Sequence, residues 1–165
     1  MRLNLNALLL TGSLLLAFSA CDSNKVYESY TSLPDKGWPA DKPVTFKVEI
    51  EDTMQACNVH LMVRHMPQYP FQNLYVLLDT KFPDGSLSTD SVQFMLFNAA
   101  GESLSDCAGD LCDARFMFRN HVRFPQAGNY EFIMRHAMRV DQYRGVLPFV
   151  LDVGIRIETS ETPAS

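Results

Sequence analysis

Cys21 is the residue of this sequence whose neighbours indicate the most specific chemistry. It follows the small residues Ser19 and Ala20, which end an uncharged run that begins at Leu3. This arrangement resembles a bacterial lipobox, with Phe18 where leucine is usual. In a lipobox the thiol is alkylated with a diacylglyceryl group, and a peptidase then cuts just before the modified cysteine. We therefore predict an exported bacterial protein whose mature chain begins at an acylated Cys21.

Acylation also predicts how the protein is held on a membrane. Each buried methylene contributes about 0.8 kcal/mol, so two or three acyl chains, such as palmitate, hold a protein firmly. The chain has 14 Lys and Arg against 19 Asp and Glu, and loss of residues 1–20 removes only Arg2, which leaves a net charge of −6. An acidic chain is a poor partner for nucleic acid and for anionic lipid. We expect a cell-envelope protein anchored by its acyl groups, in the outer membrane, with no nucleic-acid partner.

Three cysteines remain once Cys21 is assigned to lipid, so at most one intramolecular disulfide is possible. Export permits a disulfide. Cys107 and Cys112 enclose four residues and form one possible pair. Cys57–Cys107 and Cys57–Cys112 are the alternatives, and the sequence does not choose among the three.

The sequence contains no pattern that indicates an enzyme. A nucleophile elbow, a phosphate loop, a dinucleotide fingerprint and a zinc-protease helix are all missing. Cys57, His60 and His65 fall on a predicted strand, where their spacing puts neighbouring members on opposite faces. The acidic loop from 106 to 113 lacks the one-three-five spacing of a calcium loop. We therefore predict no catalytic residues, no cofactor and no metal site.

Arginines are concentrated between residues 115 and 144. They occupy positions 115, 119, 123, 135, 139 and 144. On a sandwich such residues usually form the solvent-facing half of an alternating strand. Arginine is also favoured at protein interfaces, where its planar group stacks and forms two hydrogen bonds at once. We take Arg123, Arg135 and Arg139 as a candidate interaction face.

The elements that would carry these residues are strands. From Pro43 onward apolar and polar residues alternate with period two, as in Val44, Phe46, Val48 and Ile50. Similar runs recur along the chain, near residues 59–63, 74–78, 92–96, 116–118, 130–134 and 151–157. Turn signals that contain Pro or Gly separate them. The pattern predicts an all-β fold, an antiparallel β-sandwich of about seven to eight strands that is immunoglobulin-like or jelly-roll-like.

The same features divide the chain into four parts. Residues 1–20 are the predicted signal peptide, and residues 21–42 form the lipidated N-terminus and a tether rich in Pro and Gly. The sandwich is expected over residues 43–158, and a disordered tail over 159–165. Within the sandwich, Tyr130 follows a Pro-Gln-Ala-Gly turn, where its hydroxyl is expected to bond a nearby backbone group at a sandwich corner.

Short stretches in a fixed order, spread over nearly all of the mature chain, carry a family resemblance. They are residues 21–28, Trp38, residues 69–71, 73–75, 82–85, 120–130, 137–139 and 152–158. In these stretches the sequence resembles the GldH family of gliding-motility lipoproteins. It departs from the family at Arg135-His136 and in the loop between Cys107 and Cys112. The resemblance implies a cell-envelope lipoprotein of gliding bacteria and their relatives, linked to the associated secretion machinery, with no known catalytic residues.

Two functions are consistent with these observations. The first is a non-enzymatic lipoprotein whose sandwich contacts other envelope proteins of the gliding machinery. The second is a surface lipoprotein with a carbohydrate-binding sandwich. Such modules usually display an aromatic platform, for which Tyr69, Phe71 and Tyr75 are the candidates, although core and loop packing also accounts for them.

Overall fold

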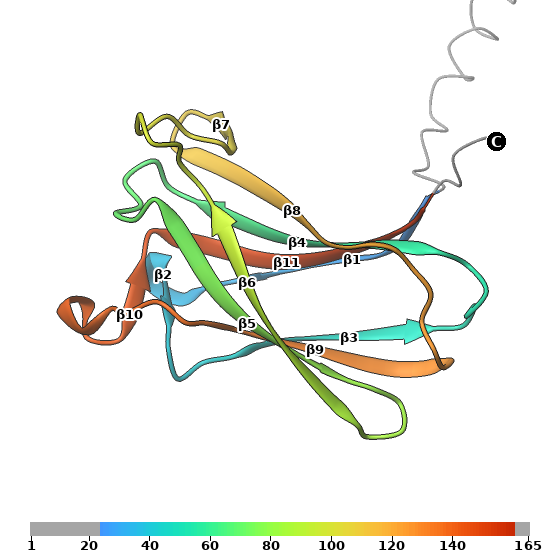
Figure 1. Ribbon diagram of the computed structural model, residues 1–165. Helices are drawn as coiled ribbons and strands as arrows, with labels where there is room; N and C mark the ends of the chain where they lie inside the picture. Colours follow the sequence, from blue (N-terminus) through green and yellow to red (C-terminus); the bar gives the residue numbers. More distant parts are fainter. Residues whose placement is uncertain (1–23, 161–165) are drawn as a thin grey trace, which may run out of the picture.

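Alternation along the chain produces strands that each bury one face. In β3 (Val44–Ile50) every second residue from Val44 to Ile50 is buried and every residue between them is exposed. The computed structural model describes residues 24–160 and shows two antiparallel sheets packed face to face (Figure 1). The expected all-β sandwich is confirmed. No helix in this described range is long and apolar enough to cross a membrane.

The two sheets have five and four strands. In the five-stranded sheet the order is β1 (Lys25–Ser32), β11 (Val150–Thr159), β4 (Cys57–His65), β8 (Leu111–Val122) and β7 (Asp106–Ala108). In the four-stranded sheet the order is β3, β9 (Gly128–His136), β5 (Asn73–Lys81) and β6 (Leu87–Met95). A short ribbon pairs β2 (Gly37–Pro39) with β10 (Val146–Pro148), and the 3-10 turns are η2 (Pro34–Lys36) and η3 (Asp141–Tyr143).

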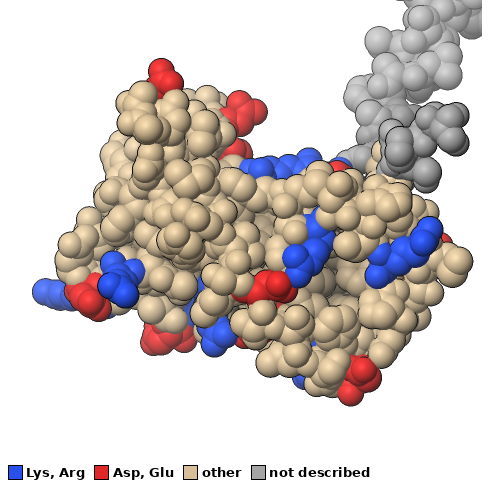
Figure 2. Space-filling view, viewed as in Figure 1, with Lys and Arg blue, Asp and Glu red and all other residues tan. Residues whose placement is uncertain are grey.

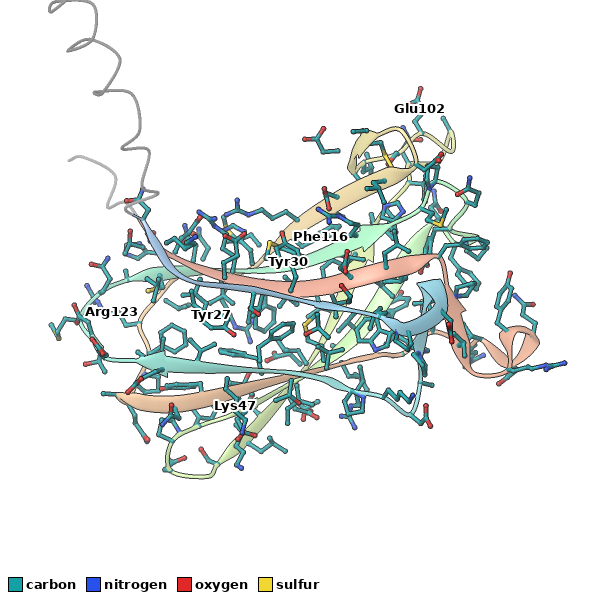
Figure 3. The ribbon with its side chains drawn as sticks, turned by 180° about the vertical axis from the view of Figure 1, so that it is seen from behind. Tyr27, Tyr30, Lys47, Glu102, Phe116 and Arg123 are labelled. Carbon is teal, nitrogen blue, oxygen red and sulfur yellow. A yellow bond between two sulfur atoms is a disulfide. The ribbon has the colours of Figure 1, made fainter. Side chains whose placement is uncertain are left out.

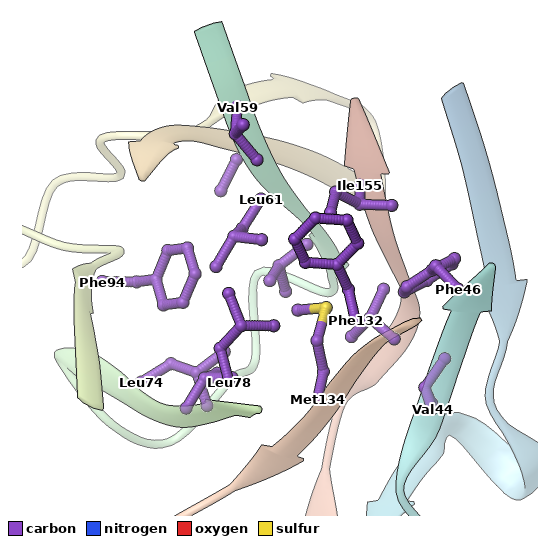
Figure 4. Close-up of a cluster of buried hydrophobic side chains, with 14 of the residues drawn as sticks. Val44, Phe46, Val59, Leu61, Leu74, Leu78, Phe94, Phe132, Met134 and Ile155 are labelled. Carbon is purple, nitrogen blue, oxygen red and sulfur yellow. The ribbon is translucent and has the colours of Figure 1, made fainter. Parts of the chain in front are cut away.

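The core lies between the sheets. Leu61 and Ile155 of the larger sheet face Leu78, Phe94 and other side chains of the smaller one, all fully buried (Figure 4). The side chains that line this contact come from the inward positions of each strand, as the alternation predicts. The corner expected at Tyr130 is also present, because its ring is fully buried and its hydroxyl donates to the Gln126 carbonyl at 2.9 Å.

The predicted tether is wrong over most of its length. Residues 25–32 form β1, which pairs with β11 from Lys25 opposite Glu158 to Ser32 opposite Asp152. Trp38 in β2 is fully buried, and its indole N–H donates to the Lys42 carbonyl at 3.1 Å. The sandwich therefore begins at residue 25 rather than at 43. The signal peptide over residues 1–20 and most of the predicted tail lie outside the described residues.

Candidate functional site

Cys21 lies outside the described residues, which begin three positions later at Asn24. Asn24 accepts a hydrogen bond at its carbonyl from the Thr159 N–H at 2.7 Å, and β1 begins at the next residue. The strand that follows the predicted lipidation site is therefore an edge of the five-stranded sheet.

The structure joins Cys107 to Cys112, one of the three pairings that the sequence leaves open. The two residues face each other across the short hairpin of β7 and β8. Cys57 is free and buried at the start of β4. Burial raises the pKa of its thiol, and the negative charge of Asp52 adds to that effect. Cys57 is therefore held as a neutral thiol, a poor nucleophile.

The three arginines of the predicted interaction face do not come together. Arg135 lies on β9 and donates to Asp79 at 2.7 Å. Arg139 is exposed in the chain that follows β9, whereas Arg123 precedes β9 and donates to the Met54 carbonyl at 2.9 Å. A nine-residue strand such as β9 spans about 27 Å. Arg123 thus lies near one end of the sandwich, and Arg135 and Arg139 lie near the other.

A different set of arginines follows β8, and we name it the basic row. It consists of Arg115 and Arg119 on β8 and Arg123 just beyond it. Arg115 donates to Glu158 at 2.8 Å, and Arg119 donates to Asp90 of β6 at 2.8 Å. Both side chains remain nearly half exposed. Figure 2 shows Lys and Arg side chains gathered on the part of the surface where β8 ends.

One exposed aromatic side chain, that of Tyr30, lies on the outer surface of the five-stranded sheet. The ring of Tyr30 lies against the backbone of Gly154, so closely that a Cβ on Gly154 would be 2.7 Å from ring atom Cδ1. Its hydroxyl donates to the sulfur of Met62 at 3.0 Å, yet 46% of the residue remains exposed. Tyr27 of the same strand instead packs between the two sheets (Figure 3).

Ion pairs surround Tyr30 on this surface, which we name the Tyr30 face and define as the outward side of β1, β11, β4 and β8. They are Arg64–Asp113 (2.8 Å), Arg64–Asp152 (3.6 Å), Arg115–Glu158 (2.8 Å) and Arg156–Glu28 (3.1 Å). His60 lies among them and is hydrogen-bonded to Glu158 at 2.9 Å. These contacts link charged side chains of β1, β11, β4 and β8 across the outer surface of the sheet. Exposed Met117, at 54% of its full accessible surface, adds an apolar side chain beside them.

The protonation states on this face follow from burial and from these pairs. Burial lowers the pKa of His60, and the nearby positive charge of Arg115 adds to that effect, although Glu158 opposes it. Burial alone would raise the pKa of Glu158, but hydrogen bonds from Arg156 and Arg115 outweigh burial and lower it. At neutral pH Glu158 is therefore ionised and His60 is neutral, so the carboxylate accepts hydrogen bonds from two guanidinium groups, those of Arg115 and Arg156.

The three aromatic residues considered for carbohydrate do not form one platform. Tyr69 is buried, its hydroxyl donates to the Asn73 carbonyl at 3.0 Å, and its ring meets Phe71 edge-on at 5.7 Å. Tyr75 lies on β5 and is the exposed member of the three. Over residues 24–160, no three His, Cys, Asp or Glu side chains cluster in a way that can hold a metal ion.

Sequence reasoning missed the Tyr30 face and the basic row. Tyr27, Ser29 and Thr31 point inward in β1, and Tyr30 points outward. The alternation is present, but two of the three inward residues are small and polar, so it carries little apolar signal. The position of Arg119 beside Asp90 depends on how the two sheets pack on each other, which local sequence does not reveal.

Known proteins resemble the chain over almost its whole length. A gliding motility lipoprotein GldH homolog of Christiangramia forsetii is 29% identical over 150 residues, covering 89% of this chain and 91% of the relative. The gliding motility lipoprotein GldH of Flavobacterium johnsoniae is 29% identical over 164 residues, covering 98% and 100%. Among solved structures, a family GH115 4-O-methyl-alpha-glucuronidase with specificity for decorated arabinogalactans matches with a TM-score of 0.47 and 8% identity, over 86% of this chain and 18% of that chain.

The family described as GldH lipoprotein matches residues 25–157. These residues run from the first residue of β1 into β11 and so include both sheets of the sandwich. The chain therefore belongs to the GldH lipoprotein family.

Proposed function

We propose that this chain is a non-enzymatic lipoprotein of the gliding machinery, held in the outer membrane by acyl groups on Cys21, whose sandwich binds another envelope protein. The two relatives are named gliding motility lipoproteins, which supports a role in gliding. The lipobox-like residues before Cys21 supply the anchor. The binding role rests on the side chains that the sandwich displays.

The Tyr30 face is the observation that carries this proposal. Tyrosine, arginine and methionine are enriched at protein interfaces, and the tyrosine here is exposed over nearly half its surface. Its ring rests on Gly154 and its hydroxyl on Met62, so little side-chain freedom remains to be lost on binding. A pre-ordered aromatic side chain among paired charges is a surface that suits a protein partner.

Site-specific photo-crosslinking in living cells tests the binding role. A photoreactive residue in place of Met117, on the Tyr30 face, should give a discrete adduct with an envelope protein. The same residue in place of Lys47, on the outer side of β3 in the other sheet, is the matched control and should give none (Figure 3). Tyr30→Ala should abolish the Met117 adduct while the protein stays folded. Equal labelling from both positions would contradict the proposal.

Membrane fractionation tests the anchor separately. The wild-type protein should sediment with the outer membrane and carry acyl groups on Cys21 by mass spectrometry. Cys21→Ser should release the protein from that fraction. A Cys21 that is found unmodified in the mature protein would refute the anchor while leaving the binding role open to its own test.

A further inference from the structure

The free edge of β8 is a long backbone surface without a strand beside it. On one side β8 pairs with β4 along its length, whereas on the other side β7 covers only residues 111–113. Residues 114–122 therefore have no neighbouring strand on that side within the described chain. Such an edge presents backbone N–H and C=O groups, which are a template for a further strand.

An apolar slot opens beside this edge, where the two sheets separate between β8 and β6. It has a volume of about 130 Å³. Its lining includes Phe118, Val122, Phe124 and Phe132, with Thr80 and Ser88 near them. A cavity of about 150 Å³ with such a lining accepts a benzene-sized molecule. The slot therefore has room for one large apolar side chain.

Charge distinguishes β8 from β6, the other strand that borders the slot. The basic row runs along β8, whereas β6 contains no Lys or Arg and carries Asp90 at the rim. The ion pair between Arg119 and Asp90 spans the opening. Arg119 also lies over the ring of Phe118, with its guanidinium carbon 4.1 Å from the ring centre. A segment that pairs with β8 thus meets positive charge on the strand itself.

We propose that the free edge of β8 receives an extended acidic segment of the envelope protein that the chain binds, which adds a strand to the five-stranded sheet. The inference rests on the proposed function and names the chemistry of the partner. In strand addition, main-chain hydrogen bonds supply affinity and pockets for alternate side chains supply specificity. One apolar side chain of the segment fills the slot beside Arg119, which lies at its rim, and carboxylates on the other face of the segment meet Arg115.

A second copy of this chain fits the edge poorly. Pairing of two β8 strands would bring two basic rows together, and like charges that face each other across strands are destabilising. An acidic segment has the complementary charge, although it must approach a protein whose overall charge is negative. Its binding should therefore weaken as salt screens the basic row.

A synthetic probe tests the inference on the mature acylated protein in detergent. The probe is a fluorescent nine-residue peptide in which glutamate and leucine alternate. We expect saturable binding by fluorescence anisotropy, together with hydrogen-exchange protection confined to the amides of residues 114–122. A peptide in which lysine replaces glutamate should bind at least about tenfold more weakly. Methylation of alternate amide nitrogens along the pairing edge of the peptide should abolish binding, because it removes the ladder donors.

Matched variants separate the slot from the basic row. Ser88→Phe fills the mouth of the slot and should weaken binding about tenfold, whereas Ser91→Phe, on the opposite face of the same strand, should have no effect. Arg119→Gln should weaken binding about threefold to fivefold, and Arg139→Gln, near the other end of the sandwich, should not. Thermal melts check that each variant folds.

Several results would overturn the inference. Unchanged affinity of the N-methylated peptide refutes strand addition, and equal effects of Ser88→Phe and Ser91→Phe refute the slot. A dimer that forms without peptide and protects residues 114–122 assigns the edge to a second copy instead. If the peptide does not bind but the photo-crosslink from position 117 forms and depends on Tyr30, only the strand addition is overturned. Peptide binding without any such adduct overturns only the role proposed for the Tyr30 face.

Discussion

Replacement of Gly154 by alanine tests directly whether residues 25–32 belong to the sandwich. Gly154 lies in β11, and Tyr30 of β1 is its cross-strand partner. A Cβ at position 154 would be 2.7 Å from Tyr30 Cδ1 and 2.8 Å from the Ser29 carbonyl oxygen. Contacts below 3.0 Å require the ring, the β1 backbone or both to move.

The expected magnitude is the difference between two effects. Alanine in place of glycine at an extended position stabilises a protein by about 0.4–1 kcal/mol, because the unfolded chain loses freedom. Overpacking a filled site costs about 1–3 kcal/mol. Since one contact involves backbone that cannot rotate away, we expect Gly154→Ala to lower the free energy of unfolding by about 1–2 kcal/mol.

A double-mutant cycle with Tyr30→Ala identifies the ring as the cause. Without the ring, only the contact with the Ser29 oxygen remains, so Gly154→Ala should cost about 1 kcal/mol less in that background. Urea unfolding of the mature protein, analysed by linear extrapolation, measures the four free energies. A neutral or stabilising Gly154→Ala would show that β1 does not lie on β11 as described. An equal cost in both backgrounds would show that the ring of Tyr30 does not rest on Gly154.

Two further predictions concern histidine and cysteine. Burial lowers the pKa of His60, His65 and His136 in the folded protein, with Arg115 also contributing at His60, so the unfolded chain takes up protons first as the pH falls below about 6.5. Stability should be fully present above that pH, and below it the free energy of unfolding should fall by up to about 1.4 kcal/mol per pH unit for each histidine. Urea unfolding between pH 7.5 and 5.5 measures this dependence on pH, and His136→Phe should make it less steep. An unchanged dependence on pH in His136→Phe would show that His136 does not contribute. Joint replacement of Cys107 and Cys112 by serine opens a short loop with a sequence separation of 5 and should lower the free energy of unfolding by about 2 kcal/mol. The loss should appear as a lower urea midpoint. An unchanged midpoint would show that the disulfide does not stabilise the fold.

Sequence predicted those parts of the fold in which local pattern and burial agree. β3 alternates apolar and polar residues without exception, and every apolar position is buried. The Tyr130 corner was predictable because the turn and the tyrosine that uses it lie within four residues of the Gln126 carbonyl that accepts its bond. β1 was not predictable, because this edge strand contributes only one large, partly buried side chain, that of Tyr27. The prolines and the glycine that follow β1 in the sequence also resemble a linker.

The candidate site was harder to predict because strand order decides which residues meet. Arg123 and Arg135 are 12 positions apart and were grouped together, yet β9 holds them at separate ends of the sandwich. Arg119 and Asp90 are 29 positions apart and are in contact. The disulfide likewise depends on the register of the hairpin, which places Cys107 opposite Cys112. That register cannot be read from the number and spacing of the cysteines alone.

Loss of the expected tether changes how the sandwich meets the membrane. With Cys21 acylated, only four residues lead to Lys25, and they span at most about 14 Å. Lys25 lies opposite Glu158, and Cys57 lies opposite both Thr159 and Val122, so one row across the five-stranded sheet joins the anchored start of β1 to the end of β8 (Figure 1). On the proposed acylation of Cys21, that end of the sheet would therefore lie close to the bilayer. The slot at Val122 lies there too, whereas the disulfide hairpin lies about 27 Å away, the length of β4 from Cys57, opposite Val122, to His65, opposite Cys112. On the proposed anchor, a partner segment that enters the slot would run near the membrane surface, which favours envelope proteins with an extended acidic region close to a bilayer as candidates.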